Sequence, residues 1–317
     1  MNFQTRYTMK SKGISPHKLD IPNLELLALQ IVEGSLTGLH RSPFHGYSAE
    51  FREHKMYAPG ESVKFIDWKV YAKTEKLYIK KFDEETNMRV RLIIDASSSM
   101  YYPETETFDL DRLNKIGFSV VASAVLTEIL RRQRDAVGLS VYCKELMISL
   151  PEKTNTLHRK TVLGTLEKLL SQPGRGRETD PVKNLHFIAE NLKRRSLSVL
   201  FSDLWMNDNN PAPLIDALKH LRYKSSELIV FHVLNKKAEA DFIFPDRPTR
   251  FVDAETGDEL NIYPGEIKRG YIRQFQRYIE QIREAFYKYN IDYYPVHTET
   301  PYRDIIASYL QKRLRMK

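Results

Sequence analysis

The sequence has a single cysteine, Cys143, and no long apolar run. A lone cysteine excludes an intrachain disulfide and any metal site built from several thiolates. No stretch of about 18 consecutive apolar residues occurs, and the first ten residues lack the apolar core of a signal peptide. We therefore expect a protein without a membrane span, located in the cytoplasm.

Several catalytic signatures are also missing. The nine histidines never fall in a His-Glu-x-x-His or other paired spacing, which disfavours zinc hydrolase chemistry. No Gly-x-x-x-x-Gly-Lys-Ser/Thr loop for nucleotide phosphates is present, so an ATPase would have to be a partner protein. The net charge of +8 is spread along the chain, with short basic groups at residues 131–134, 193–195 and 312–317. Such groups are typical of solvated helix ends, and we expect no nucleic-acid binding.

From about residue 88 the sequence alternates between strand-like and helix-like segments. With 317 residues, 42% hydrophobic and 28% charged, the chain has room for one large and one smaller globular domain. Strands are predicted at 90–94, 136–142, 145–150, 198–201, 227–234 and 291–296, and helices at 113–130, 157–170, 181–193, 211–221, 267–289 and 304–314. A hairpin is predicted at 241–262. This order predicts an α/β fold with a doubly wound, mostly parallel, Rossmann-type sheet over residues 88–317.

Residues 1–87 differ from the rest of the sequence in composition and in the order of predicted elements. A short helix is predicted near residues 24–31, and the Gly-, Pro- and aromatic-rich stretch 41–87 ends in a predicted strand at 77–82. We interpret residues 1–87 as an N-terminal helix followed by a small β-rich subdomain. Within it, Asp67 and Trp68 are interpreted as a packed aromatic beside a hydrogen-bonded carboxylate.

The most informative motif is Asp-x-Ser-x-Ser at Asp95, Ser97 and Ser99, directly after an apolar strand. Carboxylate and hydroxyl oxygens suit Mg²⁺, or alternatively Mn²⁺, and open α/β sheets bind ligands at the carboxyl ends of their strands. Two later loops offer further oxygen ligands, Thr179 and Asp203. Each residue also has a structural interpretation, because Asp, Ser and Thr are common in turns and helix caps.

The segment from Gly46 to Trp68 resembles the signature of the family called domain of unknown function 58. In that family a Tyr-x-Pro-Gly-Asp segment precedes Ile-Asp-Trp, and this chain has both, with Glu61 and Lys64 as mild departures. The flanking segments 38–42 and 73–85 and the Asp-x-Ser-x-Ser motif follow in the expected order. The resemblance covers nearly the whole chain.

This resemblance implies a von Willebrand factor A-like fold with a metal-ion-dependent adhesion site. In such a site Asp95, Ser97, Ser99 and Thr179 would hold Mg²⁺, and Asp203 would be the distal carboxylate. The remaining coordination position would accept an Asp or Glu of a partner protein. The family resemblance further implies a MoxR-type AAA+ ATPase as partner, which this protein would assist as an adaptor in remodelling or maturing client complexes. We therefore expect a non-enzymatic interaction protein.

Two other functions remain open. In a Mg²⁺-dependent phosphatase on a similar sheet, Asp95 would be the nucleophile, but such enzymes usually have a second Asp where this chain has Ser97. A nucleic-acid-binding protein is the third alternative and rests on net charge alone. Trp205, two residues after Asp203, is either an exposed binding residue at the metal edge or part of the core.

Overall fold

The centre of the computed structural model is a six-stranded sheet with the order β11-β8-β7-β4-β5-β6. The structure describes residues 7–9, 23–36, 51–58, 66–82, 88–105, 107–171, 176–193, 196–206 and 209–315. The strands of this sheet are β4 (Arg89–Asp95), β5 (Ala136–Tyr142), β6 (Leu146–Lys153), β7 (Ser196–Ser202), β8 (Glu227–Leu234) and β11 (Asp292–His297). All neighbouring pairs are parallel except β5 and β6. The predicted mixed α/β architecture with a mostly parallel sheet is confirmed.

The inner strands are buried along most of their length because both faces of the sheet are covered. Every residue of β5 and β7 is buried, as expected for parallel strands between two helical layers. The two outer strands differ, since β6 contains Pro151 and β11 contains Pro295. Where β6 pairs irregularly with β5, only glycine fits at position 138, because a Cβ there would lie 2.8 Å from the Leu150 carbonyl oxygen.

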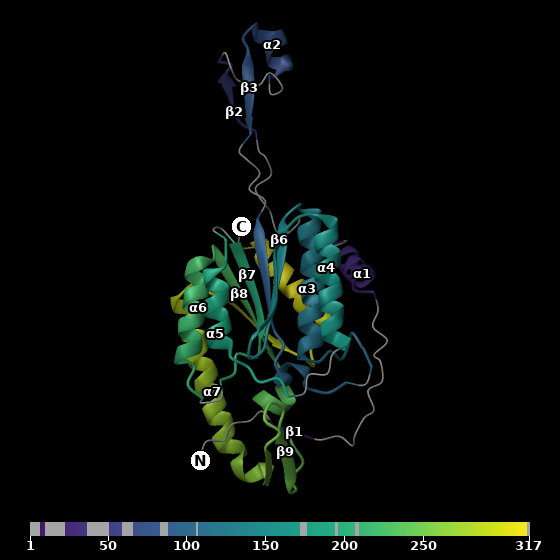
Figure 1. Cartoon of the computed structure of the whole chain (residues 1–317), viewed down its shortest axis with the longest axis vertical. Helices are drawn as coiled ribbons and strands as arrows, with labels where there is room; N and C mark the ends of the chain where they lie inside the picture. Colours follow the sequence, from purple (N-terminus) through teal and green to yellow (C-terminus); the bar gives the residue numbers. More distant parts are fainter. Residues whose placement is uncertain are drawn as a thin grey trace.

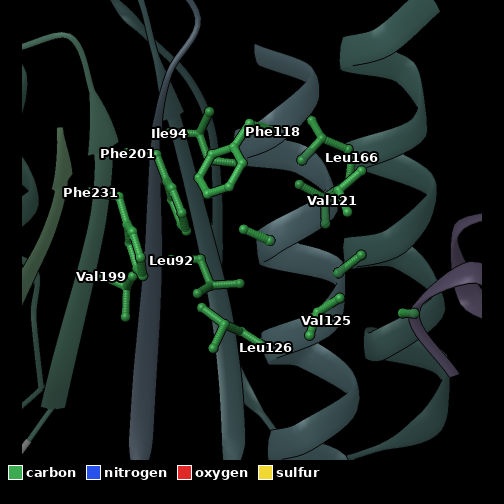
Figure 2. Packing of buried hydrophobic residues seen from close by; sticks show 14 of the residues in the cluster. Leu92, Ile94, Phe118, Val121, Val125, Leu126, Leu166, Val199, Phe201 and Phe231 are labelled. Atoms are coloured by element: carbon green, nitrogen blue, oxygen red, sulfur yellow. The ribbon is translucent and has the colours of Figure 1, made fainter. Parts of the chain in front are cut away.

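One face of the sheet packs against α1 (Leu24–Leu36), α3 (Lys115–Arg132), α4 (Thr156–Ser171) and α8 (Tyr302–Arg315) (Figure 1). Figure 2 shows Phe118 of α3 pointing toward Ile94 and Phe201 of the sheet, and Val121 and Val125 on the side of α3 that faces α4. Phe118 meets Phe201 of β7 with ring centroids 6.5 Å apart. α3 is buried on nearly all sides, because α1 and α4 cover its outer surface.

The opposite face packs against α5 (Pro181–Glu190), α6 (Ala212–Lys224) and α7 (Pro264–Lys288). Alternate residues of a strand face opposite helical layers. In β4, Leu92 and Ile94 pack on the α3 side, and Ile93 packs on the side covered by α5, α6 and α7. Helices thus cover both faces, as the sequence order predicts.

Two smaller sheets lie at opposite ends of the molecule (Figure 1). At one end β1 (Tyr7–Met9) pairs with β9 (Thr249–Asp253), which forms a hairpin with β10 (Glu259–Ile262). The hairpin predicted within residues 241–262 is therefore present. At the other end β2 (Phe51–Met56) pairs with β3 (Tyr78–Phe82) beside α2 (Trp68–Thr74).

The N-terminal signature segment is described in part, at residues 51–58 and 66–82. Asp67 caps α2, because its Oδ1 accepts hydrogen bonds from the backbone N–H groups of Lys69 and Val70 at 3.0 and 3.3 Å. Trp68 is 62% exposed, so its interpretation as a packed aromatic is wrong. The predicted domain boundary at residue 88 stays a prediction; apolar residues of α1 belong to the same core as α3.

Candidate metal centre

The Asp-x-Ser-x-Ser motif and Asp203 lie at the carboxyl ends of two adjacent parallel strands. Asp95 is the last residue of β4, and Asp203 directly follows β7, its neighbour in the sheet. The two carboxylates are 2% and 4% exposed. The fold therefore places two buried acidic side chains, 108 positions apart in the sequence, at one edge of the sheet.

The serine hydroxyls connect these two carboxylates. Asp95 Oδ1 accepts a hydrogen bond from the backbone N–H of Ser97 at 3.0 Å. The Ser97 and Ser99 hydroxyl oxygens lie 3.1 Å apart, and Ser99 Oγ donates to Asp203 Oδ2 at 2.7 Å. A single turn of 3₁₀-helix at Ser98–Tyr101 brings both hydroxyls to the same side. Four of the five predicted metal ligands thus form one connected set.

Thr179, the fifth, lies on a loop that is hydrogen-bonded to the same turn. Ser98 N–H donates to the Arg177 carbonyl at 3.0 Å, and Arg177 N–H donates to Ser98 Oγ at 2.8 Å. Asp180, not Thr179, caps the following helix, because its Oδ1 accepts from Lys183 N–H at 3.0 Å. The Thr179 hydroxyl is shielded from solvent and has no hydrogen-bond partner among the described residues. A buried hydroxyl without a hydrogen-bond partner is uncommon and needs an explanation, which a bound ligand would provide.

Sequence reasoning missed the residue that neutralises Asp203. Lys115, at the start of α3, is fully buried; its Nζ donates to Asp203 Oδ2 at 2.9 Å and to Glu239 Oε1 at 2.6 Å. Burial opposes the positive charge, but the two carboxylates outweigh it and raise the pKa of Lys115 above its usual value. Nothing in the local sequence distinguishes Lys115 from a solvated lysine at a helix start, and Glu239 lies 124 positions away.

Other missed residues contact the side chain of Asp95 and the backbone of Asp203. Asp95 Oδ2 accepts from the hydroxyls of Ser202 at 3.0 Å and Tyr142 at 3.4 Å. His232 Nε2 lies 2.9 Å from the Asp203 carbonyl oxygen, and burial lowers its pKa to about 4, so His232 is neutral at pH 7. The two hydroxyls hold the Asp95 carboxylate in place, and His232 contacts the main chain of Asp203, all without adding charge.

Acidic side chains outnumber basic ones in the connected set of described residues at this edge. The set contains the carboxyl groups of Asp95, Asp203 and Glu239 and the ammonium group of Lys115, and burial raises the pKa of Glu239. Burial, followed by repulsion from Asp203, raises the pKa of Asp95 from 3.8 to about 6. At pH 7 Asp95 is therefore ionised in a place that disfavours its charge. A divalent cation would relieve both effects.

The residues fit Mg²⁺ bound mainly by hydroxyl groups. Asp95, Ser97, Ser99 and Thr179 supply a carboxylate and three hydroxyls, which are oxygen ligands of the kind Mg²⁺ prefers. Asp203 Oδ2 already accepts hydrogen bonds from Ser99 and Lys115, so Asp203 fits a place behind the direct ligands. Among the residues that the structure describes, no three His, Cys, Asp or Glu side chains form a metal cluster.

The chain itself covers this edge of the sheet. The segment between β8 and α7 contributes Glu239, through one π-helical turn at Lys236–Ala240, and Glu255, at the tip of the β9–β10 hairpin. Glu255 is buried, and its Oε2 accepts a hydrogen bond from Thr179 N–H at 3.2 Å. In this conformation the candidate ligands are enclosed.

Trp205 belongs to the core on the α7 side. Its ring stacks on Phe275 at 5.8 Å and lies 5.0 Å from the ring of Tyr278. Leu204, between Asp203 and Trp205, adopts a left-handed backbone conformation with φ of 54°, which turns the chain sharply after β7. Of the two interpretations of Trp205, the structure supports core packing.

A matching family model identifies the chain. The model described as "Protein of unknown function DUF58" matches residues 53–285, which is most of the sequence. The chain belongs to the DUF58 family. The match includes the Asp-x-Ser-x-Ser motif, the Thr179 loop, Asp203 and the hairpin that carries Glu255. All five candidate ligands of this DUF58 protein therefore lie inside the family region.

Relatives of this DUF58 protein include uncharacterized proteins of Mycobacterium tuberculosis strain H37Rv and of Mycobacterium bovis. Each is 26% identical over 236 residues, covering 74% of this chain and 69% of the relative. Among solved structures, BatB of Bacteroides thetaiotaomicron is 14% identical with a TM-score of 0.43, covering 72% of this chain and 99% of BatB. An aerotolerance-related membrane protein of Bacteroides fragilis is 12% identical with a TM-score of 0.40, covering 73% and 100%.

Within the described ranges no helix is long and apolar enough to cross a membrane. The cytoplasmic location stays a prediction.

Two histidines that are far apart in the sequence lie next to each other in the structure, since the Nδ1 atoms of His186 and His220 are 2.8 Å apart. They line an open pocket of about 610 Å³ beside α5 and α6. Glu190 pairs with His220 at 2.9 Å, and among the residues that the structure describes this group does not form a three-residue metal cluster.

Proposed function

We propose that this DUF58 protein is a non-enzymatic, Mg²⁺-dependent protein-interaction module with a von Willebrand factor A-like domain. The observation that supports the proposal most directly is the buried, unsatisfied hydroxyl of Thr179 on a loop that is bonded to the Asp-x-Ser-x-Ser turn. The raised pKa of Asp95, caused by burial and then by repulsion from Asp203, further supports a cation beside this carboxylate.

In the proposed site the side chains have different roles, cation binding and charge balance. Asp95 and the three hydroxyls hold the cation, which when bound supplies a Lewis-acidic position for one more oxygen ligand. Lys115 balances Asp203, so the direct shell carries only the one negative charge of Asp95. An ion held in this way keeps net positive charge and attracts a carboxylate. The partner class that fits is a protein with an accessible Asp or Glu.

The resemblance to the family called domain of unknown function 58 implies a more specific partner, a MoxR-type AAA+ ATPase. We propose that this protein helps such an ATPase to remodel or mature client complexes, with the ATPase or its client supplying the acidic ligand. Nucleic acid is not required by any feature of the site.

Isothermal titration calorimetry with Mg²⁺ tests the proposal. Wild type should bind Mg²⁺, and Asp95→Ala should not, while circular dichroism shows both to be folded. Asp135→Asn is the matched control, because Asp135 is also a buried carboxylate with a pKa raised by burial, but it accepts from Met88 N–H at the far end of β4. Capture of an AAA+ ATPase from host lysate in Mg²⁺, lost in EDTA and in Asp95→Ala, identifies the partner. Equal Mg²⁺ binding by Asp95→Ala contradicts the proposed site.

The phosphatase alternative makes a different prediction. Asp95 would attack phosphorus, yet both of its oxygens accept hydrogen bonds, from Ser97, Ser202 and Tyr142. Release of phosphate from a generic phosphomonoester in Mg²⁺, abolished in Asp95→Asn, would support this alternative. If the protein released no phosphate from any member of a broad substrate panel, this alternative would have no support.

A further inference from the structure

The pocket beside α5 and α6 lies away from the candidate metal centre. Arg222, one of its lining residues, contacts the carbonyl oxygens of Ser225 and Asn290, which come just before β8 and β11 begin. The candidate metal centre follows the carboxyl ends of β4 and β7. Because these four strands are neighbours in the sheet and run parallel, the pocket and the metal centre lie toward opposite edges of the sheet.

Arg222 gives this pocket a positive charge that is held in place but not neutralised. Its Nε donates to the Asn290 carbonyl oxygen at 3.0 Å, and its Nη1 donates to the Ser225 carbonyl oxygen at 3.1 Å. Among the described residues no carboxylate pairs with this guanidinium, and no hydrogen bond uses Nη2. A guanidinium that is fixed in advance loses little freedom when it binds an anion, and its planar geometry suits a carboxylate.

The acidic side chains around the pocket have other partners. Asp216, a lining residue, lies 3.5 Å from Lys219 Nζ. Glu190 contacts His220 Nε2 and Lys224 Nζ, each at 2.9 Å. With the guanidinium included and the histidines neutral, the charged lining side chains and these ion-pair partners comprise three cations and two carboxylates. The remaining positive charge is complementary to an acidic partner.

Tyrosine rings supply an apolar wall. Tyr289 is half-buried, and the Nζ atoms of Lys219 and Lys288 lie 5.8 and 5.4 Å from its ring centroid. Tyr223 is 86% exposed, so its side of the pocket is open to solvent. Pockets for small molecules enclose most of their ligand, whereas an open pocket with Tyr and Arg is typical of protein recognition, in which the rest of the partner covers the rim.

We propose that this pocket binds an acidic segment of a partner protein, whose carboxylate pairs with Arg222 and whose apolar or aromatic side chain packs on Tyr223 and Tyr289. This segment differs from the acidic ligand of the proposed Mg²⁺ site, because no cation is needed to hold it. A partner at this pocket leaves the metal edge free for a second protein.

Selection from a phage library of random dodecapeptides, on the immobilised full chain in EDTA, supplies the probe. Fluorescence anisotropy with the selected peptides, synthesised and labelled, then measures their affinity in solution. The peptides should combine acidic residues with an aromatic or aliphatic one, and their binding should weaken as ionic strength rises. Binding should be equal in Mg²⁺ and in EDTA, and in wild type and Asp95→Ala, because the pocket and the metal centre lie at opposite edges of the sheet.

Two exposed positions test the pocket without disturbing the contacts of Arg222. Tyr223→Ala and Lys219→Glu should each weaken peptide binding at least about fivefold. Leu157→Ala and Lys160→Glu make comparable changes at exposed positions of α4, on the other face of the sheet, and should bind like wild type. Circular dichroism should show all four variants to be folded.

Three results would overturn the inference: no enrichment over a blank surface, selected peptides without acidic residues, or equal binding by wild type and both pocket variants. Sedimentation velocity tests a different occupant. A wild-type dimer that dissociates in Tyr223→Ala would assign the pocket to a second copy of this chain, and would also overturn the inference.

Discussion

Replacing Asp95 by Asn should stabilise the protein in the absence of Mg²⁺, at the expense of its metal response. The pKa of Asp95 rises from 3.8 to about 6 in the folded state, chiefly through burial and then through repulsion from Asp203. Asn keeps an oxygen for the Ser97 N–H, and the hydroxyls of Ser202 and Tyr142 can turn to accept from its amide. The variant therefore removes the charge and retains the local hydrogen bonds.

The magnitude follows from proton linkage. A carboxyl with a raised folded-state pKa binds its proton more tightly in the folded state, so its contribution to stability is complete below pH 3.8 and is lost as the pH rises through 6. Ionised Asp95 thus costs about 3 kcal/mol at pH 7, roughly half of that at pH 5 and only a small part of it at pH 4. The stability advantage of Asp95→Asn over wild type should shrink in the same way.

Urea unfolding of both proteins at several pH values, in EDTA, measures this difference directly. In excess Mg²⁺ wild type should gain stability, by about 2.7 kcal/mol at a hundred times the dissociation constant, while Asp95→Asn should not. Asp135→Asn should also be stabilised at pH 7, because burial raises the pKa of Asp135 to about 6, but it should keep the wild-type response to Mg²⁺. A difference between Asp95→Asn and wild type that stays constant from pH 7 to pH 4 would refute the reasoning.

Three further changes probe the same edge of the sheet. Thr179→Val removes a buried, unsatisfied hydroxyl without changing shape; we expect unchanged unfolding in EDTA and about tenfold weaker Mg²⁺ binding by calorimetry, and a marked loss of stability would contradict this. Lys115→Met leaves Asp203 buried without its cation and should lower the free energy of unfolding by about 3–5 kcal/mol in urea; a loss below about 1 kcal/mol would argue against the ion pair. Trp68→Phe leaves Trp205 as the only indole, and its emission should change on Mg²⁺ addition, because Trp205 lies two residues after Asp203 and its backbone N–H donates to Asp203 Oδ1 at 3.4 Å; the signal should vanish when Asp95→Ala is added.

The sheet was predictable because its strands carry a continuous apolar signal. Buried strands such as β7 and β8 read as short β-branched and aromatic runs, and α3 and α4 have apolar residues at helical spacing, so the alternation of strand and helix is visible without any long-range information. The segments that failed are exposed ones: Trp68 has the residue type of a core position but lies on a short helix with no buried residues.

The site was predictable only in its strand-terminal half. Asp95 and Asp203 follow apolar strands, and that local signal places them at the same edge of a parallel sheet. Lys115 and Glu239 carry no such signal, because their pairing depends on how α3 and the segment after β8 meet in three dimensions. Glu255 was visible as part of a turn, but a turn residue points to solvent in most hairpins, and only the tertiary structure turns this one inward.

The two outer strands of the sheet limit how this protein can meet another chain. Proline lacks the N–H that an incoming strand would need, and both β6 and β11 contain one, Pro151 and Pro295. Neither border therefore offers a complete hydrogen-bonding ladder for strand addition, the mode by which many sheets capture extended peptides or pair with copies of themselves. Association through this sheet is directed to its helical faces and to the loops at its ends, which protects the protein from edge-to-edge aggregation at the same time.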